Sequence, residues 1–158
     1  MEDDVLVNKA ATVERCVARA REEFERDPAT FATDFTRQDA AVLNIQRACE
    51  AVLDMGQHLV RRHGLGVPQS ARDVFELLSR GQWIDAKLAN ALKRMVAFRN
   101  IAVHDYQSLL LPILVNVITQ HLADFLEFTQ IILKRTVADY HLPHNEDRSV
   151  STDDIKHA

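Results

Sequence analysis

The segment "FTRQDAAVLNIQRACEAVLDMGQHLVRRH", from Phe35 to His63, decides the fold class. Its apolar side chains recur at spacings of three and four, which is the period of one face of an α-helix. A helix of this length spans about 40 Å at roughly 1.5 Å per residue. We therefore expect a bundle of helices braced by this segment, with its apolar face formed by Val42, Ile45, Cys49, Val52 and Leu59.

The segments on both sides show the same periodicity, and no stretch alternates with the two-residue period of a β-strand. Gly64 is placed to end the long helix, and Ser70 with Asp73 resembles a capping box at the start of the next one. The other expected helices cover residues 4–26, 70 to the stop at Gly81, 84 or 85 to 100, and 106–137. Pro112 is tolerated if it lies in the first turn of the last helix. The sequence therefore predicts an all-α, up-and-down bundle of about five helices.

The length and composition of the chain are those of one domain. Of its 158 residues 47% are hydrophobic, and there are only four Gly and four Pro, which favours long elements with short connections. Such a chain buries a sizeable core. We assign residues 1–138 to the helical domain and expect residues 139–158, which are polar and aperiodic, to be a disordered tail.

The charge is distributed unevenly along the chain. A formal net charge of −4 argues against a surface that coats nucleic acid in general. The segment from Lys87 to Tyr106 is nevertheless basic, because it contains four cations, Lys87, Lys93, Arg94 and Arg99, and one acid, Asp105. This segment suits a small anion-binding region.

Targeting, disulfide and metal signals are weak. Cys16 and Cys49 lie in helical patterns without a disulfide framework, and no apolar run reaches the ~18 residues of a membrane span. His141 and His144 are spaced for a metal but have no carboxylate or cysteine beside them. We expect a cytoplasmic protein that needs neither a metal nor a cofactor and does not bind a membrane.

The stretch "AFRNIAVHDY", Ala97 to Tyr106, places polar groups inside an apolar helical stripe. Arg99 extends the stripe, but in an unbroken helix His104 would point about 140° away from it. We expect a break at residues 100–103, since Asn100 tolerates the left-handed conformation. The break would place His104 and Asp105 at a helix N-terminus, where free N–H groups favour a phosphate.

Simpler interpretations of these and other polar residues stay open. Arg99 could cap the helix, His104 could be a hinge residue, and Tyr106 could pack in the core. We expect His121 to be a buried core or interface residue. His58 and His63 flank Arg61 and Arg62 at a helix end that is either solvated or in contact with RNA, and Asn44, Gln46, Arg47 and Glu50 either border a cleft or lie on the surface.

The octet "RNIAVHDY" has the form Arg-x4-His-x-Tyr and resembles the motif of the HepT-like toxins in the HEPN superfamily. The segments "FTRQDAAVLNIQRACEAVLDMGQHL", "GLGVPQSARDVFELL" and "LKRMVAFRNIAVHDYQ" are similar to that family in order and spacing. The resemblance extends from about Met1 to Lys134.

The resemblance implies a toxin that cleaves RNA, either tRNA or mRNA, without a metal, acting as a homodimer with a shared cleft. By position, Arg99 and His104 are then the catalytic pair, and Asn100 orients the turn. Tyr106 matches the tyrosine that an MntA-like nucleotidyltransferase antitoxin modifies with AMP. A histidine suits proton transfer near neutral pH, and an arginine suits the charge that develops on phosphate. The rival hypothesis is a catalytically inactive helical partner of a nucleotidyltransferase.

Overall fold

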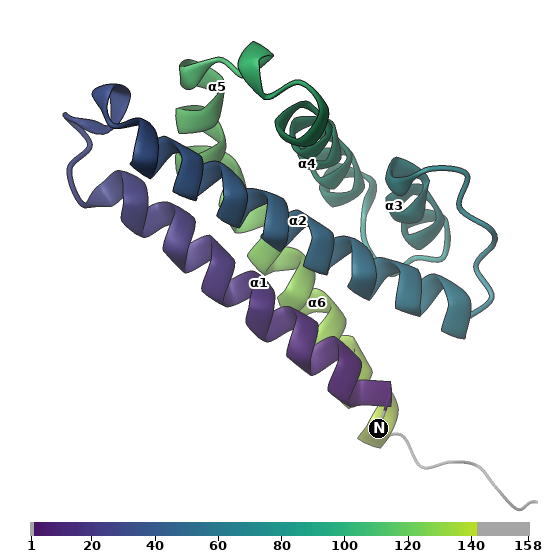
Figure 1. The fold of residues 1–158 in the computed structure, drawn as a ribbon. Helices are drawn as coiled ribbons and strands as arrows, with labels where there is room; N and C mark the ends of the chain where they lie inside the picture. The colour runs from purple at the N-terminus through teal and green to yellow at the C-terminus, as the bar shows by residue number, and fades with distance from the viewer. Residues whose placement is uncertain (1, 142–158) are drawn as a thin grey trace, which may run out of the picture.

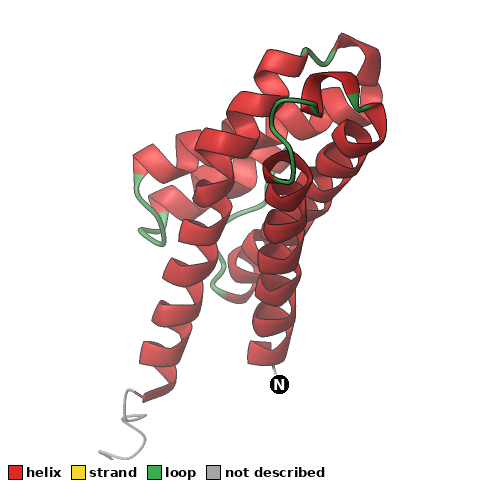
Figure 2. Ribbon diagram, turned by 90° about the vertical axis from the view of Figure 1, so that its left-hand side faces the viewer, coloured by secondary structure: helices red, strands yellow, loops and turns green. Residues whose placement is uncertain are grey.

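The computed structural model describes residues 2–141, and this part of the chain consists of helices and loops without a β-strand (Figure 2). The all-α prediction is confirmed. The α-helices are α1 (Glu2–Glu25), α2 (Phe35–Arg62), α3 (Ala71–Arg80), α4 (Ala86–His104), α5 (Leu111–Asn116) and α6 (Leu122–His141). Two 3₁₀ turns, η1 (Phe31–Thr33) and η2 (Tyr106–Ser108), and a π-helical turn, η3 (Val117–His121), complete the order.

The long helix α2 is the centre of the bundle, as its length predicts. It runs antiparallel to α1, and α6 packs against both of them (Figure 1). Helices α3 and α4 pack on α2 and on each other, and α4 also contacts α6. Every long helix of the described chain therefore touches α2.

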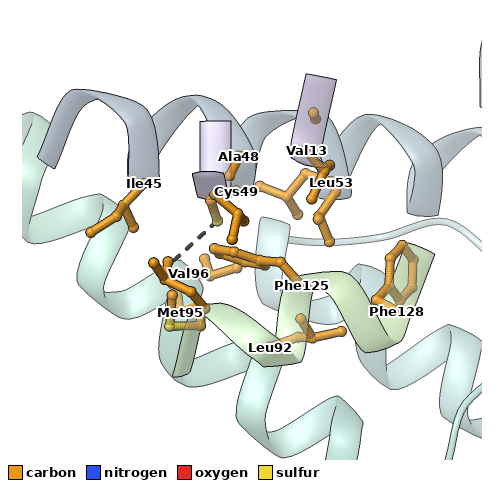
Figure 3. Close-up of a cluster of buried hydrophobic side chains, with 14 of the residues drawn as sticks. Val13, Ile45, Ala48, Cys49, Leu53, Leu92, Met95, Val96, Phe125 and Phe128 are labelled. Atoms are coloured by element: carbon orange, nitrogen blue, oxygen red, sulfur yellow. Dashed lines mark hydrogen bonds between the residues drawn. The ribbon is translucent and has the colours of Figure 1, made fainter. Parts of the chain in front are cut away.

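The core is formed where four helices meet (Figure 3). The side chains there include Val13 of α1, Ile45, Cys49 and Leu53 of α2, Leu92, Met95 and Val96 of α4, and Phe125 and Phe128 of α6. Each such large side chain, when fully buried, contributes roughly 1.5–3 kcal/mol. The predicted apolar face of α2 is also confirmed, since all five of its residues are buried.

Side-chain caps fix the starts of three helices. Asp34, Ser70 and Asp85 accept hydrogen bonds from the N–H groups of Arg37 (3.1 Å), Asp73 (3.2 Å) and Leu88 (2.8 Å), respectively. Each cap satisfies one of the free donors of a first turn. Gly64, just beyond the end of α2, has the left-handed φ of 60° that suits a glycine.

The predicted break at residues 100–103 is wrong. Helix α4 continues without interruption to His104, and Asn100 does not take up the left-handed conformation. The reason is packing: Ala102 is 8% exposed and fixes the last turn of α4 against the core. The chain leaves the helix only at Asp105, where φ is −149° and ψ is 55°.

The last predicted helix begins later than expected. Residues 106–108 form η2, and the helix starts at Leu111, so Pro112 lies in its first turn as required. The predicted tail, 139–158, falls largely outside the described residues, although α6 continues to His141. Among the described helices, none has both the length and the apolarity to cross a membrane.

Candidate functional site

Arg99 lies on the face of α4 that packs toward α2. Only 17% of its side chain is exposed, and its Nη1 lies 3.1 Å from Oε1 of Glu50 on α2. Its Nε is buried and has no hydrogen-bond partner within the described chain. The guanidinium is therefore held by a carboxylate on one side and keeps an unused donor.

His104 is the last residue of α4 and is exposed. Because α4 is unbroken, His104 lies about 140° around the helix and roughly 7.5 Å along it from Arg99. The expected phosphate site at a helix N-terminus is wrong, since His104 stands at a C-terminus, where the dipole favours a cation such as imidazolium. Within one chain, the side chains of Arg99 and His104 therefore cannot both contact the same small phosphate.

Tyr106 stands in η2, two residues beyond His104, and is 43% exposed. Its hydroxyl donates a hydrogen bond to Oδ1 of Asp39 in the second turn of α2. Partial desolvation, together with the bond to this carboxylate, raises the pKa of Tyr106 to about 12. The core position that remained open for Tyr106 is therefore wrong, and its hydroxyl is held at the surface.

Asp39 is a residue that the sequence reasoning missed. It lies 67 positions from Tyr106, and no local motif links the two. Asn100 was expected to orient the turn, but it is exposed within α4 and the turn comes five residues later. The turn is closed instead by Ser108, whose Oγ donates to Oδ2 of Asp105 at 2.6 Å.

An apolar groove of about 290 Å³ separates α4 from α5 and η3. Phe98, Ile101 and Ile113 line it, and Ile101 and Ile113 are 40% and 45% exposed. His121 lies at this groove with its Nδ1 3.4 Å from Oδ2 of Asp124, so it is not a core residue. Exposed apolar side chains thus surround the end of α4, and they also include Val103 and Leu110.

A second, polar groove of about 500 Å³ lies between α1 and α2. Asn44, Arg47 and Glu50, which were expected to border a cleft or the surface, line it together with cations of α1. Glu50 therefore faces both this groove and Arg99. At the far end of α2, Arg61 is exposed, and the ring of His63 lies tilted by 43° against Trp83 with centroids 4.7 Å apart.

Comparison with known proteins identifies the family of this chain. The profile of the family described as "Ribonuclease HepT-like" matches residues 13–132. The chain is 47% identical over 130 residues to the mRNA nuclease HepT of Shewanella oneidensis, and the match covers 82% of this chain and 97% of that protein.

Solved structures give the same result. A tri-AMPylated HEPN toxin of Shewanella oneidensis in complex with the MNT antitoxin is 47% identical, with a TM-score of 0.78 over 82% of this chain and 96% of that one. A toxin–antitoxin structure with AMP-PNP has a TM-score of 0.79 at 46% identity, over 82% and 97% of the two chains. The cytosolic protein YutE of Bacillus subtilis shares the fold, with a TM-score of 0.73 at 19% identity over 85% and 90%. The chain belongs to the HepT-like ribonuclease family.

Proposed function

We propose that this protein is a ribonuclease toxin whose active site is shared between two copies of the chain. The observation that carries the proposal is the divergence of Arg99 and His104 on an unbroken α4. A second copy related by two-fold symmetry brings the His104 of one chain toward the Arg99 of the other. The exposed apolar residues around the end of α4, Ile101, Val103 and Ile113, favour such an interface.

The two side chains suit cleavage of RNA by its own 2′-hydroxyl. The 2′-oxygen attacks the adjacent phosphorus, the bond from phosphorus to the 5′-oxygen breaks, and the departing 5′-oxygen takes up a proton. His104, exposed and free to rotate, accepts the 2′-proton. Arg99 stabilises the charge on the five-coordinate phosphorus with its Nη groups, of which Nη1 pairs with Glu50 in the free protein.

The same proposal includes control by a nucleotidyltransferase of the MntA kind, as in the Shewanella complex, acting in the cytoplasm. The Tyr106 hydroxyl is at the surface, and Tyr106 follows His104 by two residues in the chain. A phosphodiester attached there would add bulk and negative charge where the RNA backbone has to bind. The modified protein should therefore be folded and inactive, with weaker RNA binding.

Incubation of the purified protein with total RNA in EDTA tests the nuclease assignment. The parent should cleave RNA, whereas Arg99→Ala and His104→Ala should each lose at least ~10²-fold in rate. Arg80→Ala, which removes an exposed cation at the end of α3, is the matched control and should cleave normally. Uncleaved RNA with the folded parent protein would favour the rival hypothesis of an inactive binding partner, and loss of activity only in EDTA would indicate a metal-dependent reaction.

A further inference from the structure

The hydrogen bond between Tyr106 and Asp39 joins two exposed side chains from distant parts of the sequence. Contacts between exposed polar groups contribute little to stability, because water solvates both partners when they are apart. The main physical effect of this hydrogen bond is local. It fixes the direction of the phenol and holds a carboxylate oxygen of Asp39 next to the phenol proton.

We propose that Asp39 is the general base for the transfer of AMP to Tyr106, an inference that rests on the function proposed above. The Tyr106 oxygen attacks the α-phosphorus of a nucleoside triphosphate that the partner nucleotidyltransferase supplies. The new bond joins the phenol oxygen to phosphorus, and the bond from that phosphorus to pyrophosphate breaks. Pyrophosphate leaves with the electron pair, and the phenol proton passes to Oδ1 of Asp39.

Tyr106 needs a base because its hydroxyl holds its proton firmly. With a pKa raised to about 12, only a minute fraction of Tyr106 is phenolate at neutral pH. The phenol becomes strongly acidic only while its bond to phosphorus forms, so a weak base suffices if it is already in contact. Protein kinases use an aspartate in this way to accept the proton of a substrate hydroxyl.

The other ionisable groups near Tyr106 are less suited to this role. Asp105 already accepts a hydrogen bond from Ser108 at 2.6 Å. His104 lies two residues earlier, at the end of α4, and among the described residues it does not accept the hydrogen bond of the phenol. Asp39 is the carboxylate that accepts a hydrogen bond from the Tyr106 hydroxyl, which is the geometric condition for a general base.

The test measures initial rates of AMP addition by intact mass, using the full-length protein, a partner nucleotidyltransferase of the MntA kind, and magnesium–ATP. Asp39→Asn should slow the modification roughly 10²-fold at neutral pH, with little change in the KM for ATP. Asp39→Glu should recover much of the rate. Asp54→Asn is the matched control: it removes a carboxylate from the same helix, one that pairs with Lys9 and not with Tyr106, and should have the parental rate.

The pH profile separates a base from a merely structural residue. Without Asp39 the reaction depends on phenolate, whose fraction rises about tenfold per pH unit below a tyrosine pKa near 10. The rate ratio of parent to Asp39→Asn should therefore shrink steeply between about pH 7 and pH 9.

Each failure points to a different part of the argument. If the parent chain gains no AMP, the proposed control mechanism is wrong and the role of Asp39 falls with it. If the parent is modified and folded Asp39→Asn is modified equally fast, only the base assignment is wrong. A rate deficit that stays constant with pH would also overturn it, because it would show that Asp39 merely positions the phenol.

Discussion

The carboxylate of Glu50 neutralises a guanidinium that is mostly enclosed by protein. Removing the charge with Glu50→Gln leaves Arg99 with a weaker partner beside its unpaired Nε. We expect the free energy of unfolding in urea to fall by about 1 kcal/mol, a modest value because Glu50 is 47% exposed. Asp54→Asn, which breaks the exposed pair with Lys9, should change it by less; equal effects of the two variants would contradict the argument.

Tyr106 should ionise at a higher pH than an ordinary tyrosine. Its pKa of about 12 means that it stays protonated at pH 10, where a free phenol is half ionised. Ultraviolet titration in a Tyr140→Phe background isolates the signal, since the chain has two tyrosines. Adding Asp39→Asn should lower the midpoint, because the carboxylate is one cause of the shift.

The raised pKa of Tyr106 also makes the free energy of unfolding depend on pH. Because the folded pKa is above the unfolded one, Tyr106 stabilises the fold below about pH 10. This contribution is lost as the pH rises toward about 12. A midpoint at or below pH 10 in a protein that circular dichroism shows to be folded would contradict the contact with Asp39.

At the level of the helices, Arg37 holds the connection between α1 and α2 together. It is 7% exposed, and its guanidinium donates to the carbonyl oxygens of Glu23 (2.8 Å) and Asp27 (2.9 Å) and to Oγ1 of Thr30 (2.9 Å). These bonds satisfy acceptors that the end of α1 leaves free.

Replacing Arg37 should therefore destabilise the whole bundle. Arg37→Met should lower the free energy of unfolding by about 2–4 kcal/mol, since several acceptors lose a charged donor at once. Arg37→Lys should recover only part of the loss, because an ammonium cannot reproduce the fork of the guanidinium. Urea denaturation of the two variants measures both effects. Full recovery by lysine would show that charge alone matters there.

The helices could be predicted from the sequence because their signals are local. The three-and-four spacing and the caps at Ser70 and Gly64 lie within a few residues of the features that they define. The break at residues 100–103 was misplaced because it was inferred from the need to bring Arg99 and His104 together. The local sequence, "NIAV", continues the helix, and Ala102 packs in the core.

The contacts of the candidate site could be predicted only in part. The Arg-x4-His-x-Tyr spacing identifies Arg99, His104 and Tyr106 without reference to the fold. Their partners Glu50 and Asp39 come from α2, and no spacing in the sequence indicates which turn of α2 faces which turn of α4. Tertiary pairing of this kind depends on how the helices pack, which periodicity does not define.

At the scale of the whole molecule, the proposed active site needs a second copy of the chain, because Arg99 and His104 diverge on α4. We expect sedimentation at micromolar concentration to give twice the chain mass of 18.0 kDa. Ile101→Glu, which places a charge on the exposed apolar groove at α4, should weaken the dimer and RNA cleavage together. Val67→Glu, at a residue that is 78% exposed in the connection between α2 and α3, is the control and should leave both unchanged.

A composite site also predicts that two inactive variants repair each other. In a dimer of Arg99→Ala with His104→Ala, one of the two sites receives both altered residues and the other receives none. If the chains mix at random, half of the dimers are of this kind, and the mixture should regain about a quarter of the parental activity. The variants are unfolded and refolded together, and RNA cleavage is compared with each variant refolded alone. No recovery in a mixture that native mass spectrometry shows to contain the mixed dimer would mean that each chain supplies its own Arg99 and His104.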